Sequence, residues 1–584
     1  MSSKTNVGES QRLNGLQTGL IALNVLSRVY AAFFMIISDC DETFNYWEPL
    51  NLLIRGFGKQ TWEYSPEYAI RSYTYLIPYV IVTYPIKLVE KFVNIPSYYQ
   101  FYWIRLIALC GFTCFTELRL FYSINSSLNR KVGNWFLFLS SIAPGMSHAG
   151  VALLPSSFAM NCVTMATANS LSAISENSAN YSVQAIVWFL VGGIVGWPFA
   201  LALGLPFGLF ILIQNIKRFN VLFSIIKGCI AGLVSTLIIS TAIDSWFYQK
   251  IDLVPLNIVL YNVFGEQGEG PEIFGVEPFQ YYILNLLVNF NVVAILGYVG
   301  LVVNAILFGE KNRYKVLITV SLPLLIWSLI FGSQPHKEER FLYPIYPLLI
   351  LSSSLLLTLI FPMVTFVSKG ITANKVNSKH IEKLIQLLFA FSVGMVSILR
   401  IINLVENYST PLSVHREIST LPISNISVNV CTGREWYHFP NSFFLPDNYR
   451  LKFVRSGFDG LLPGDFLEGT SLKTSTSSIP PNMNNKNQYS DDKVIDFDEC
   501  SYYIDNSQAA NLEVGEPNIV ERSGKVLKVN KGWSVVQCQN IINPSGTSSG
   551  IGKLLWIPEY VRSLISYNVD YMDYCLMERK KDIV

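Results

Sequence analysis

The stretch VLFSIIKGCIAGLVSTLIISTAI, residues 221–243, is an apolar run with a single charged residue, Lys227. A helix of about 20 apolar residues is long enough to cross the hydrocarbon core of a bilayer. A helix also satisfies its own backbone hydrogen bonds, which lipid cannot do. This stretch therefore predicts a membrane-spanning helix, and with it an integral membrane protein.

Comparable apolar runs recur on both sides of this stretch. They lie at residues 18–38, 73–90, 101–123, 134–153, 155–175, 184–214, 281–308, 315–332, 342–363 and 384–405. Together the runs predict a polytopic α-helical membrane protein with about eleven spans. The run 184–214 is too long for one straight helix, and we expect a break at Trp197-Pro198.

The composition agrees with a place in the membrane. Of 584 residues, 51% are apolar and 14% are charged, against about 25% charged in a typical soluble protein. The formal net charge of +2 indicates neither a nucleic-acid partner nor an acidic one. Residues 1–17 are polar, and the run that follows them lacks the cleavage site of a signal peptide. We therefore expect a cytosolic N-terminus, residues 1–17, followed by an uncleaved first span.

Basic residues in the short loops predict the orientation of the spans. Three clusters occupy alternate loops, so they share one side of the membrane, which the positive-inside rule makes cytosolic. The clusters are Lys217 and Arg218; Lys311, Arg313 and Lys315; and Lys369, Lys375, Lys379 and Lys383. The segments then expected on the lumenal side are 39–72, 244–280, 333–341 and 406–584. Three basic residues do not fit this scheme, namely Arg119, Arg130 and Lys131.

The sequence turns polar at about residue 406, with Pro and Gly punctuation and alternating apolar patches. A transmembrane domain, residues 18–405, is thus expected to precede a small lumenal domain, residues 406–584, that is β-rich or α+β. Four cysteines in this tail permit two disulfides whose pairing stays open: Cys431, Cys500, Cys538 and Cys575. Ser471–Asn487 is rich in Ser, Thr, Asn and Pro and predicts a disordered insertion. Asn407 and Asn425 begin glycosylation sequons on the same predicted side.

The first loop, residues 39–72, begins with four acids within ten residues, namely Asp39, Asp41, Glu42 and Glu48. Carboxylates gathered at a membrane surface repel one another and raise each other's pKa. A solvated turn has no packing reason to collect them, so the cluster indicates a function.

The same loop continues with Trp62, Glu63 and Tyr64, followed by Arg71. Aromatic ring faces stack on the C–H surface of a sugar, while carboxylates accept its hydroxyl protons. The pattern is typical of sugar binding. An aromatic belt at the level of the lipid headgroups is an alternative interpretation, and the two are compatible.

A second charged cluster, residues 336–340 (HKEER), follows a predicted span on the same side as the acidic loop. His336, Lys337 and Arg340 are suited to hold a phosphate, Arg340 through two parallel hydrogen bonds. Glu338 is a further candidate for substrate binding. The alternative is a charged cap that ends a helix at the membrane surface, but two clusters of opposite character on one face favour a site.

One acidic and one basic cluster suit a particular reaction. A sugar on a lipid phosphate already has a good leaving group, so its departure needs cations rather than a general acid. The acceptor hydroxyl needs one base, which a positioned carboxylate supplies. The two clusters therefore predict glycosyl transfer by single displacement, whereas a glycosidase needs two carboxylates that flank the bond.

Asp41-Glu42 with Phe44 and Asn45, together with residues 336–341 (HKEERF), resembles the dolichyl-phosphate-mannose-dependent mannosyltransferases of the endoplasmic reticulum. These belong to glycosyltransferase family 22 and have the multi-spanning GT-C architecture. Residues 39–49 and 60–73 look specifically like the α-1,2-mannosyltransferases that extend the lipid-linked N-glycan precursor. The resemblance covers residues 18–405, and the tail offers no motif.

The resemblance implies a donor, dolichyl-phosphate β-mannose, and an acceptor, the dolichyl-diphosphate glycan with six or eight mannoses. It also implies a multi-pass enzyme of the endoplasmic reticulum membrane with a lumenal active site and no cofactor. A β donor and an α product mean inversion, in agreement with one base. Asp41 is then the expected base, and Glu42 orients it or the acceptor. His336, Lys337 and Arg340 attend the donor phosphate, assisted by Arg71.

Other functions are also compatible with parts of the sequence. Asp39-Cys40-Asp41 spells the D-x-D pattern of metal-dependent transferases, although the resembled family needs no metal. Charges within the spans, such as Arg105, Glu117 and Arg119, could line a transport path, but no internal repeat supports a transporter. Glu117 and Arg119 are more simply a local pair. A scaffold subunit and a sister mannosyltransferase, α-1,6-specific or acting on the GPI anchor, complete the alternatives.

Overall fold

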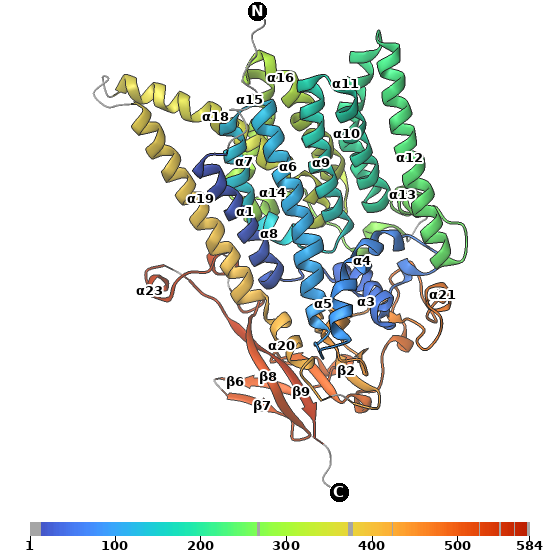
Figure 1. Ribbon diagram of the computed structural model, residues 1–584. Helices are drawn as coiled ribbons and strands as arrows, with labels where there is room; N and C mark the ends of the chain where they lie inside the picture. Colours follow the sequence, from blue (N-terminus) through green and yellow to red (C-terminus); the bar gives the residue numbers. More distant parts are fainter. Residues whose placement is uncertain are drawn as a thin grey trace, which may run out of the picture.

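The computed structural model describes residues 13–265, 269–371, 378–422, 424–524, 526–547, 550–565 and 567–580. Long helices form a bundle, and a sheet-containing unit packs against its lower end (Figure 1). Most of the predicted cytosolic segment, residues 1–12, lies outside the described residues.

Most of the chain before residue 410 is helical. The helices of the bundle, some of them joined end to end through a π-helical turn, are α1 (Gly15–Phe34), α5 (Tyr98–Trp103), α6 (Gly111–Ser127), α7 (Arg130–Ile142), α9 (Pro155–Glu176), α10 (Ala179–Val191), α11 (Leu205–Asn215), α12 (Phe219–Tyr248), α14 (Gln280–Phe290), α15 (Val292–Leu307), α16 (Glu310–Val316), α17 (Leu322–Ser333), α18 (Tyr346–Ile371) and α19 (Ser378–Tyr408). The others are α2 (Cys40–Glu42), α3 (Glu48–Arg55), α4 (Tyr73–Glu90), α8 (Pro144–Ala149), α13 (Val254–Phe264) and α20 (Thr410–Ile418).

Seven of the described helical segments are long and apolar enough to cross a membrane, or eight if α14 and α15 count as one span bent by 114°. This is fewer than the eleven runs expected, because several runs form helices that are polar or buried within the protein. α9, for example, is rich in Ser, Thr and Asn, and nearly all of its residues are buried. The long run 184–214 is divided at Trp197 as predicted, between the segments Ala179–Gly196 and Pro198–Asn215.

The prediction of a span at residues 73–90 is wrong. This run forms α4, which lies at the lower end of the bundle (Figure 1). The Thr74 backbone N–H at its start donates to Asp244 near the end of α12 (2.9 Å), while Lys87 near its other end donates to the α3 backbone. Aromatic residues and two internal prolines suit a helix at the membrane interface as well as an apolar span, so the run was ambiguous.

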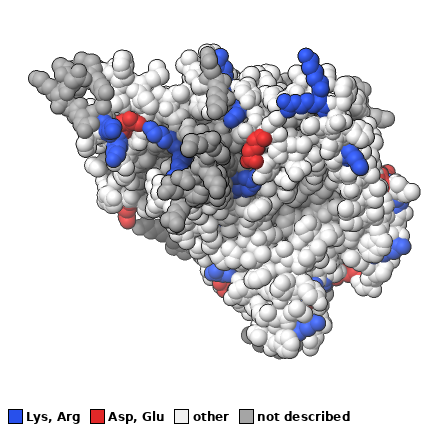
Figure 2. All heavy atoms as spheres, turned by 45° about the horizontal axis from the view of Figure 1, so that its top comes forward, with Lys and Arg blue, Asp and Glu red and all other residues white. Residues whose placement is uncertain are grey.

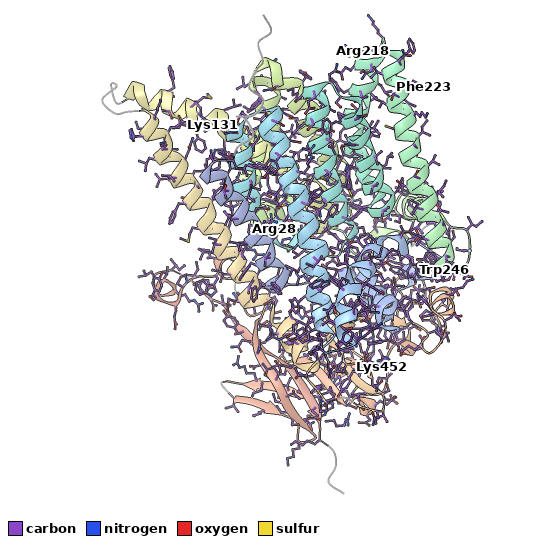
Figure 3. The ribbon with its side chains drawn as sticks, in the orientation of Figure 1. Arg28, Lys131, Arg218, Phe223, Trp246 and Lys452 are labelled. Carbon is purple, nitrogen blue, oxygen red and sulfur yellow. A yellow bond between two sulfur atoms is a disulfide. The ribbon has the colours of Figure 1, made fainter. Side chains whose placement is uncertain are left out.

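Basic side chains lie toward the upper end of the bundle. Arg218 and Lys131 both lie there (Figure 3), and Lys and Arg side chains follow the upper rim above a broad uncharged surface (Figure 2). Lys131 therefore fits the predicted scheme once α4 is removed from the alternation of spans. The division of 184–214 into two segments then restores the expected alternation for the later loops.

The predicted local pair of Glu117 with Arg119 is wrong. Glu117 accepts from Arg28 of α1, with Nη2 to Oε1 at 2.8 Å, and both side chains are buried. Asn24 donates to the same carboxylate at 2.8 Å, whereas Arg119 donates to Ser123 on its own helix. Burying one partner without the other would leave an uncompensated charge, so the pair ties α1 to α6.

The C-terminal region forms a five-stranded sheet of order β3-β2-β5-β9-β8, which confirms the predicted β-rich or α+β tail. β2 is parallel to β3 and β5, while β9 is antiparallel to β5 and β8. Its strands are β2 (Val428–Thr432), β3 (Tyr449–Phe453), β5 (Tyr502–Asn506), β8 (Trp533–Ile542) and β9 (Tyr571–Arg579). A hairpin, β6 (Val520–Ser523) and β7 (Val526–Val529), and short helices α21 (Leu472–Ser477), α22 (Ile551–Leu554) and α23 (Glu559–Arg562) complete the region. The disulfides Cys431–Cys500 and Cys538–Cys575 use all four cysteines of the tail.

Residues 471–487 are not a disordered insertion. They form α21 and a defined strap that contacts the helical bundle. The Thr476 hydroxyl donates to the Phe247 carbonyl at 2.9 Å, and the Ser478 carbonyl accepts from Gln60 at 3.0 Å. Polar composition alone suggested disorder, but here the polar groups find partners on the bundle and on the first loop.

The first loop and the C-terminal region are joined by strand pairing, by an ion pair and by a shared apolar core. β1 (Lys59–Gln60) pairs antiparallel with β4 (Gly464–Asp465), and Lys59 forms an ion pair with Asp465 at 2.7 Å. Phe44 of the loop lies in the apolar core of the C-terminal region. The two segments therefore form one structure at the lower end of the bundle.

Candidate functional site

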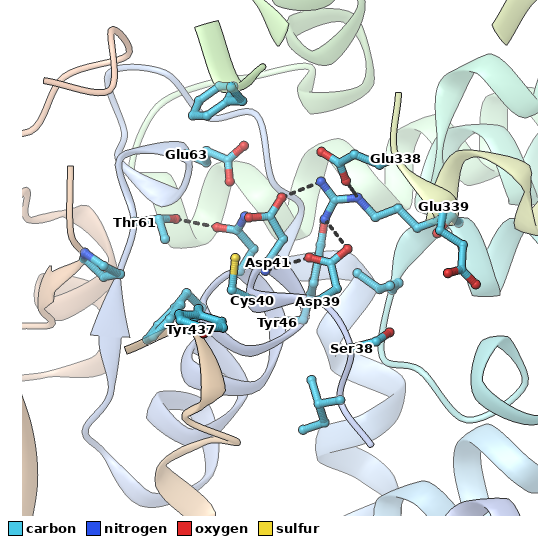
Figure 4. A pocket seen from close by; sticks show the side chains of 18 of the residues that line it. Ser38, Asp39, Cys40, Asp41, Tyr46, Thr61, Glu63, Glu338, Glu339 and Tyr437 are labelled. Carbon is cyan, nitrogen blue, oxygen red and sulfur yellow. Dashed lines mark hydrogen bonds and ion pairs between the residues drawn. The ribbon is translucent and has the colours of Figure 1, made fainter. Parts of the chain in front are cut away.

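A cavity of about 830 Å³ opens at the lower end of the bundle, between the first loop and the C-terminal region (Figure 4). Both charged clusters predicted from the sequence reach it, together with the end of α19 and several loops of the C-terminal region. The predicted candidates that line it are Asp39, Asp41, Trp62, Glu63, Arg71, His336, Glu338 and Arg340.

A short helical turn presents the acids. The Asp39 side chain caps α2 by accepting the Asp41 backbone N–H at 2.9 Å, a role for which Asp is well suited. The chain then continues as a π-helical turn, Thr43–Trp47, into α3. Asp39 and Asp41 both point toward Arg340 (Figure 4).

Arg340 joins the two predicted clusters. Its guanidinium binds Asp41 Oδ2 at 2.5 Å and Asp39 Oδ2 at 3.1 Å, and its Nε also contacts Glu338. A planar guanidinium with five N–H donors can serve several carboxylates at once. Three acids thus share one buried cation, which balances part of their repulsion.

The two aspartates differ in charge state. Burial raises the pKa of Asp39 to about 7, helped by repulsion from Asp41 and Glu338 and opposed by Arg340. Burial also acts on Asp41, but Arg340 and Arg71 outweigh it and hold the pKa of Asp41 below its usual value. Of the two aspartates, Asp41 is therefore the one that stays ionised near neutral pH, and 35% of its side chain is exposed.

Glu63 and Arg71 form a second ion pair on the cavity wall, with Nη2 to Oε1 at 2.6 Å. The Arg71 guanidinium also lies over the ring of Tyr46, 5.7 Å from its centroid. Trp62 packs edge-to-face on Tyr68 nearby. These contacts place an aromatic surface and a paired charge beside Asp41.

His336 is held between two acceptors. Its Nδ1 lies 2.7 Å from the Gly275 carbonyl and its Nε2 lies 2.8 Å from Glu338 Oε1. Burial lowers the pKa of His336, but these two hydrogen bonds outweigh burial and raise it overall. Lys337, by contrast, turns away from the cavity and donates to the backbone carbonyls of Glu277 (2.9 Å) and Gln334.

Three other predicted site residues do not line the cavity, namely Glu42, Glu48 and Tyr64. Glu42 is buried and accepts from Trp47 Nε1 and the Leu153 backbone N–H, each at 2.9 Å. The Glu48 carboxylate is fully buried and accepts from the backbone of Lys59 and of Ser442. Neighbouring residues on a helical turn point in different directions, so Asp41 faces the cavity while Glu42 and Glu48 hold the loop in place.

Tyr64 is likewise buried, stacked edge-to-face on Tyr73 with ring centroids 4.9 Å apart. It shapes the loop rather than the cavity surface. Four predicted residues, Glu42, Glu48, Tyr64 and Lys337, are thus structural in this arrangement.

The cavity has a wall that the sequence analysis missed. It comes from the C-terminal region and includes Trp436, Tyr437, His438, Phe439 and Phe458. The aromatic run Trp436–Phe439 was the available signal, but nothing in the sequence indicated that the tail would reach the acidic loop.

The Asp39-Cys40-Asp41 turn has ligand atoms within 4.8 Å of one another, close enough to share a metal ion. The guanidinium of Arg340 lies against both aspartates and supplies positive charge at this position. The carboxylates of this turn therefore already have a positively charged partner, the guanidinium of Arg340.

A polytopic bundle with an acid-and-arginine cavity at one end agrees with the membrane-bound glycosyltransferase that the sequence predicts. Sequence comparison gives the particular group. A model of the Alg9-like mannosyltransferase family matches residues 20–446, and the chain belongs to this family.

Curated relatives agree over most of the chain. The α-1,2-mannosyltransferase ALG9 of Saccharomyces cerevisiae is 40% identical, over 96% of this chain and 97% of that protein. The α-1,2-mannosyltransferase alg9 of Schizosaccharomyces pombe is 38% identical over 82% of each chain. The human α-1,2-mannosyltransferase ALG9 is 35% identical, over 82% of this chain and 77% of that protein.

A solved structure matches the fold. The crystal structure of ArnT from Cupriavidus metallidurans bound to undecaprenyl phosphate superimposes with a TM-score of 0.51, over 84% of this chain and 93% of that one. At 9% sequence identity the match concerns the fold, and it confirms the predicted GT-C architecture.

Proposed function

We propose that this enzyme transfers mannose from dolichyl-phosphate β-mannose to the dolichyl-diphosphate-linked N-glycan precursor, with inversion and formation of an α-1,2 linkage. Asp41 is the general base. The acceptors are the glycans with six and eight mannoses. The family and the names of its curated relatives support the sugar and the linkage, and the geometry of the cavity supports the role of Asp41.

The observation that carries the proposal is the environment of Asp41. Arg340, at 2.5 Å, keeps Asp41 ionised, and part of the Asp41 side chain is open to the cavity. A single positioned base is what an inverting transfer requires. Two other acids of the cavity already have partners, since Glu63 pairs with Arg71 and Glu339 contacts His148.

The chemical step balances with the groups present. Asp41 accepts the proton of an acceptor hydroxyl as that oxygen attacks C1 of the donor mannose from the side opposite the phosphate. A new C1–O bond forms, the bond from C1 to the phosphate oxygen breaks, and its electron pair leaves with dolichyl phosphate. The proton stays on Asp41 until it passes to solvent.

Cations of the second cluster attend the leaving group. Arg340 and His336 lie on the cavity wall opposite the C-terminal region, and both are held by Glu338. A phosphate entering here would compete with Glu338 for these two donors. Charge-assisted hydrogen bonds to phosphate are strong, so Arg340 and His336 are the proposed phosphate contacts and Glu338 is their resting partner.

The test is a transfer assay on the purified protein in detergent. It offers dolichyl-phosphate mannose and a synthetic acceptor lipid with six mannoses, and compares wild type with Asp41→Asn. Glu67→Gln is the matched control, because Glu67 is an exposed acid of the same loop. We expect one α-1,2 mannose to be added by wild type and by Glu67→Gln, and transfer by Asp41→Asn to be at least about 10²-fold slower.

Two outcomes would change the proposal. Near-normal transfer by Asp41→Asn would move the base to another acid, with Asp39 the next candidate. Failure of wild type on this acceptor would call for a GPI-type acceptor, since the human GPI α-1,2-mannosyltransferase 3 is also similar, at 24% identity over 56% of this chain.

The proposed location is the endoplasmic reticulum membrane, with the cavity facing the lumen. The two sequons of the tail can test this orientation. Asn425 is exposed on the loop before β2, whereas Asn407 is buried and bonded to Asn403 at 2.6 Å and to Tyr571 at 3.0 Å. We expect Asn425→Gln to lose an endoglycosidase-sensitive mass shift in membranes and Asn407→Gln to keep it. Absence of any glycan on wild type would remove support for the lumenal side.

A further inference from the structure

The C-terminal wall of the cavity contains a built polar group that the proposed mechanism does not use. His438 lies there, between Tyr437 and Phe439, at the end of the turn Trp436–His438. Its Nδ1 is 2.5 Å from Glu435 Oε2. Within the described residues, its Nε2 has no hydrogen-bond partner, and 27% of the side chain is exposed.

Glu435 holds the imidazole in one orientation. The carboxylate is almost fully buried, with 1% of the side chain exposed, and its other oxygen accepts from Asn506 of β5 at 2.5 Å. Burial raises the pKa of Glu435, but these hydrogen bonds outweigh it and lower the pKa overall. Glu435 accepts the hydrogen bond from Nδ1–H and fixes the ring, which leaves Nε2 available to hydrogen-bond a ligand.

The segment that carries His438 is anchored to the sheet. Arg434, the residue before Glu435, binds both carboxylate oxygens of Asp505 at 2.7 and 3.2 Å and the backbone after β5. The disulfide Cys431–Cys500 joins β2 to the residues just before β5. A side chain with such support loses little freedom when it binds a ligand.

The same segment is fixed relative to Asp41. The Thr43 hydroxyl, two residues after Asp41, donates to the carbonyls of Phe439 (3.1 Å) and Pro440 (2.9 Å). Phe44 stacks on Phe439 and lies 6.0 Å from Trp436, ring centroid to ring centroid. The C-terminal wall is thus locked to the turn that presents the base.

The chemistry of this wall suits a neutral sugar rather than a phosphate. Trp436 and Tyr437 offer aromatic surface, and His438 offers one hydrogen-bonding atom, Nε2. The buried charge behind it is the negative charge of Glu435. An anion is repelled by that carboxylate, and the cavity's arginines lie on the other wall. Ring faces beside an oriented hydrogen-bonding group are a common arrangement for recognising a pyranose.

We propose that His438, oriented by Glu435, forms an acceptor-glycan subsite with Trp436 and Tyr437, and hydrogen-bonds a hydroxyl of a mannose residue other than the one attacked. The C-terminal region then selects the acceptor, while the first loop performs the transfer. This inference rests on the proposed function and adds to it the residues that recognise the glycan.

The test combines variants with acceptors of two sizes. His438→Ala is compared with His380→Ala, an exposed histidine near the opposite end of α19, on acceptor lipids with all six mannoses and on lipids trimmed of the arm that is not extended. We expect His438→Ala to raise the acceptor KM about tenfold, the worth of one well-placed hydrogen bond. The donor KM stays unchanged, and on the trimmed acceptor the effect falls below about twofold, because the coupling is lost.

Glu435→Gln keeps a hydrogen bond to Nδ1 but removes the charge, so its acceptor KM should rise about threefold. An equal penalty for His438→Ala on both acceptors, or a change in the donor KM, would overturn the inference while leaving the proposed function in place. If wild type transfers no mannose, the proposed function fails, and binding becomes the readout. Equilibrium dialysis with the radiolabelled six-mannose glycan must then show about tenfold weaker binding to His438→Ala than to wild type, and equal binding would reject the subsite.

Discussion

The two walls of the cavity differ in kind. The bundle wall is charged: Asp39, Asp41, Glu338 and Arg340 form one network of ion pairs, and Glu63 with Arg71 forms another. The C-terminal wall is aromatic, with one oriented histidine. Proton and phosphate chemistry need the first kind of surface, and recognition of a neutral sugar needs the second. The comparison suggests that chemistry and selection are divided between two segments distant in sequence.

The largest effect should come from removing the base on the charged wall. Asp41→Asn should lower kcat by about 10²- to 10⁴-fold, the usual contribution of a positioned base, with a near-normal acceptor KM. Its neighbour Glu42 is buried against Trp47 and Leu153. Glu42→Gln should therefore lower the thermal unfolding midpoint and change kcat much less than Asp41→Asn does. A reversed pattern in the two variants would contradict the assignment of Asp41 to the cavity and Glu42 to the interior.

A smaller effect is expected when Arg340 is replaced by Lys. The charge remains, but one ammonium cannot reproduce the contacts to Asp41, Asp39 and Glu338. We expect the donor kcat/KM to fall about thirtyfold, which corresponds to the loss of a charge-assisted hydrogen bond. The measurement is initial rate against donor concentration at saturating acceptor. A change confined to the acceptor KM would argue that Arg340 does not face the phosphate.

The aromatic wall should show the opposite selectivity. Trp436→Ala removes a ring that packs on Phe458 at 4.6 Å and on Phe44, and should raise the acceptor KM about tenfold without changing the donor KM. Trp246→Ala is the control, because Trp246 lies on the outer surface of α12 (Figure 3). An equal rise in the donor KM and the acceptor KM would mean that Trp436 supports the fold of the cavity as a whole.

The smallest effect concerns pH. Asp39 has a pKa of about 7, so lowering the pH from about 8 to about 6 adds a proton to it. Protonated Asp39 no longer competes as an anion for Arg340, and the donor KM should therefore fall about threefold. Asp39→Asn should have the low KM at both pH values. His336 gains a proton in the same direction, since its pKa is raised; retention of the pH dependence in Asp39→Asn would assign the effect to His336.

Much of the helical bundle could be predicted because apolar runs of membrane length have few other structures available. The break at Trp197-Pro198 was visible for the same reason, since proline interrupts a helix. Residues 73–90 misled because an interfacial helix and a span share an apolar composition. Glu117 misled because its partner, Arg28, lies 89 residues away, and sequence proximity favoured Arg119.

The candidate site was predictable as two clusters and less so residue by residue. Asp39, Asp41 and Arg340 meet as expected. Which of two adjacent acids faces the cavity depends on the phase of a short turn, and that phase is set by contacts such as Glu48 with Ser442, 394 residues apart. The aromatic wall that the tail contributes has no sequence signal that links it to the acidic loop, so only the docking of the C-terminal region reveals it.

The two hydrogen bonds from Thr43 to Phe439 and Pro440 span 396 and 397 residues, and this separation has a consequence for biosynthesis. At ordinary translation rates the ribosome needs on the order of a minute to proceed from one partner to the other. During that time the Asp39–Asp41 turn has been synthesised, but the C-terminal wall that packs against it has not. A transcript with a stop codon after α19 would thus yield a chain that retains its long helices and the Asp39–Asp41 turn but lacks the surface that docks on that turn.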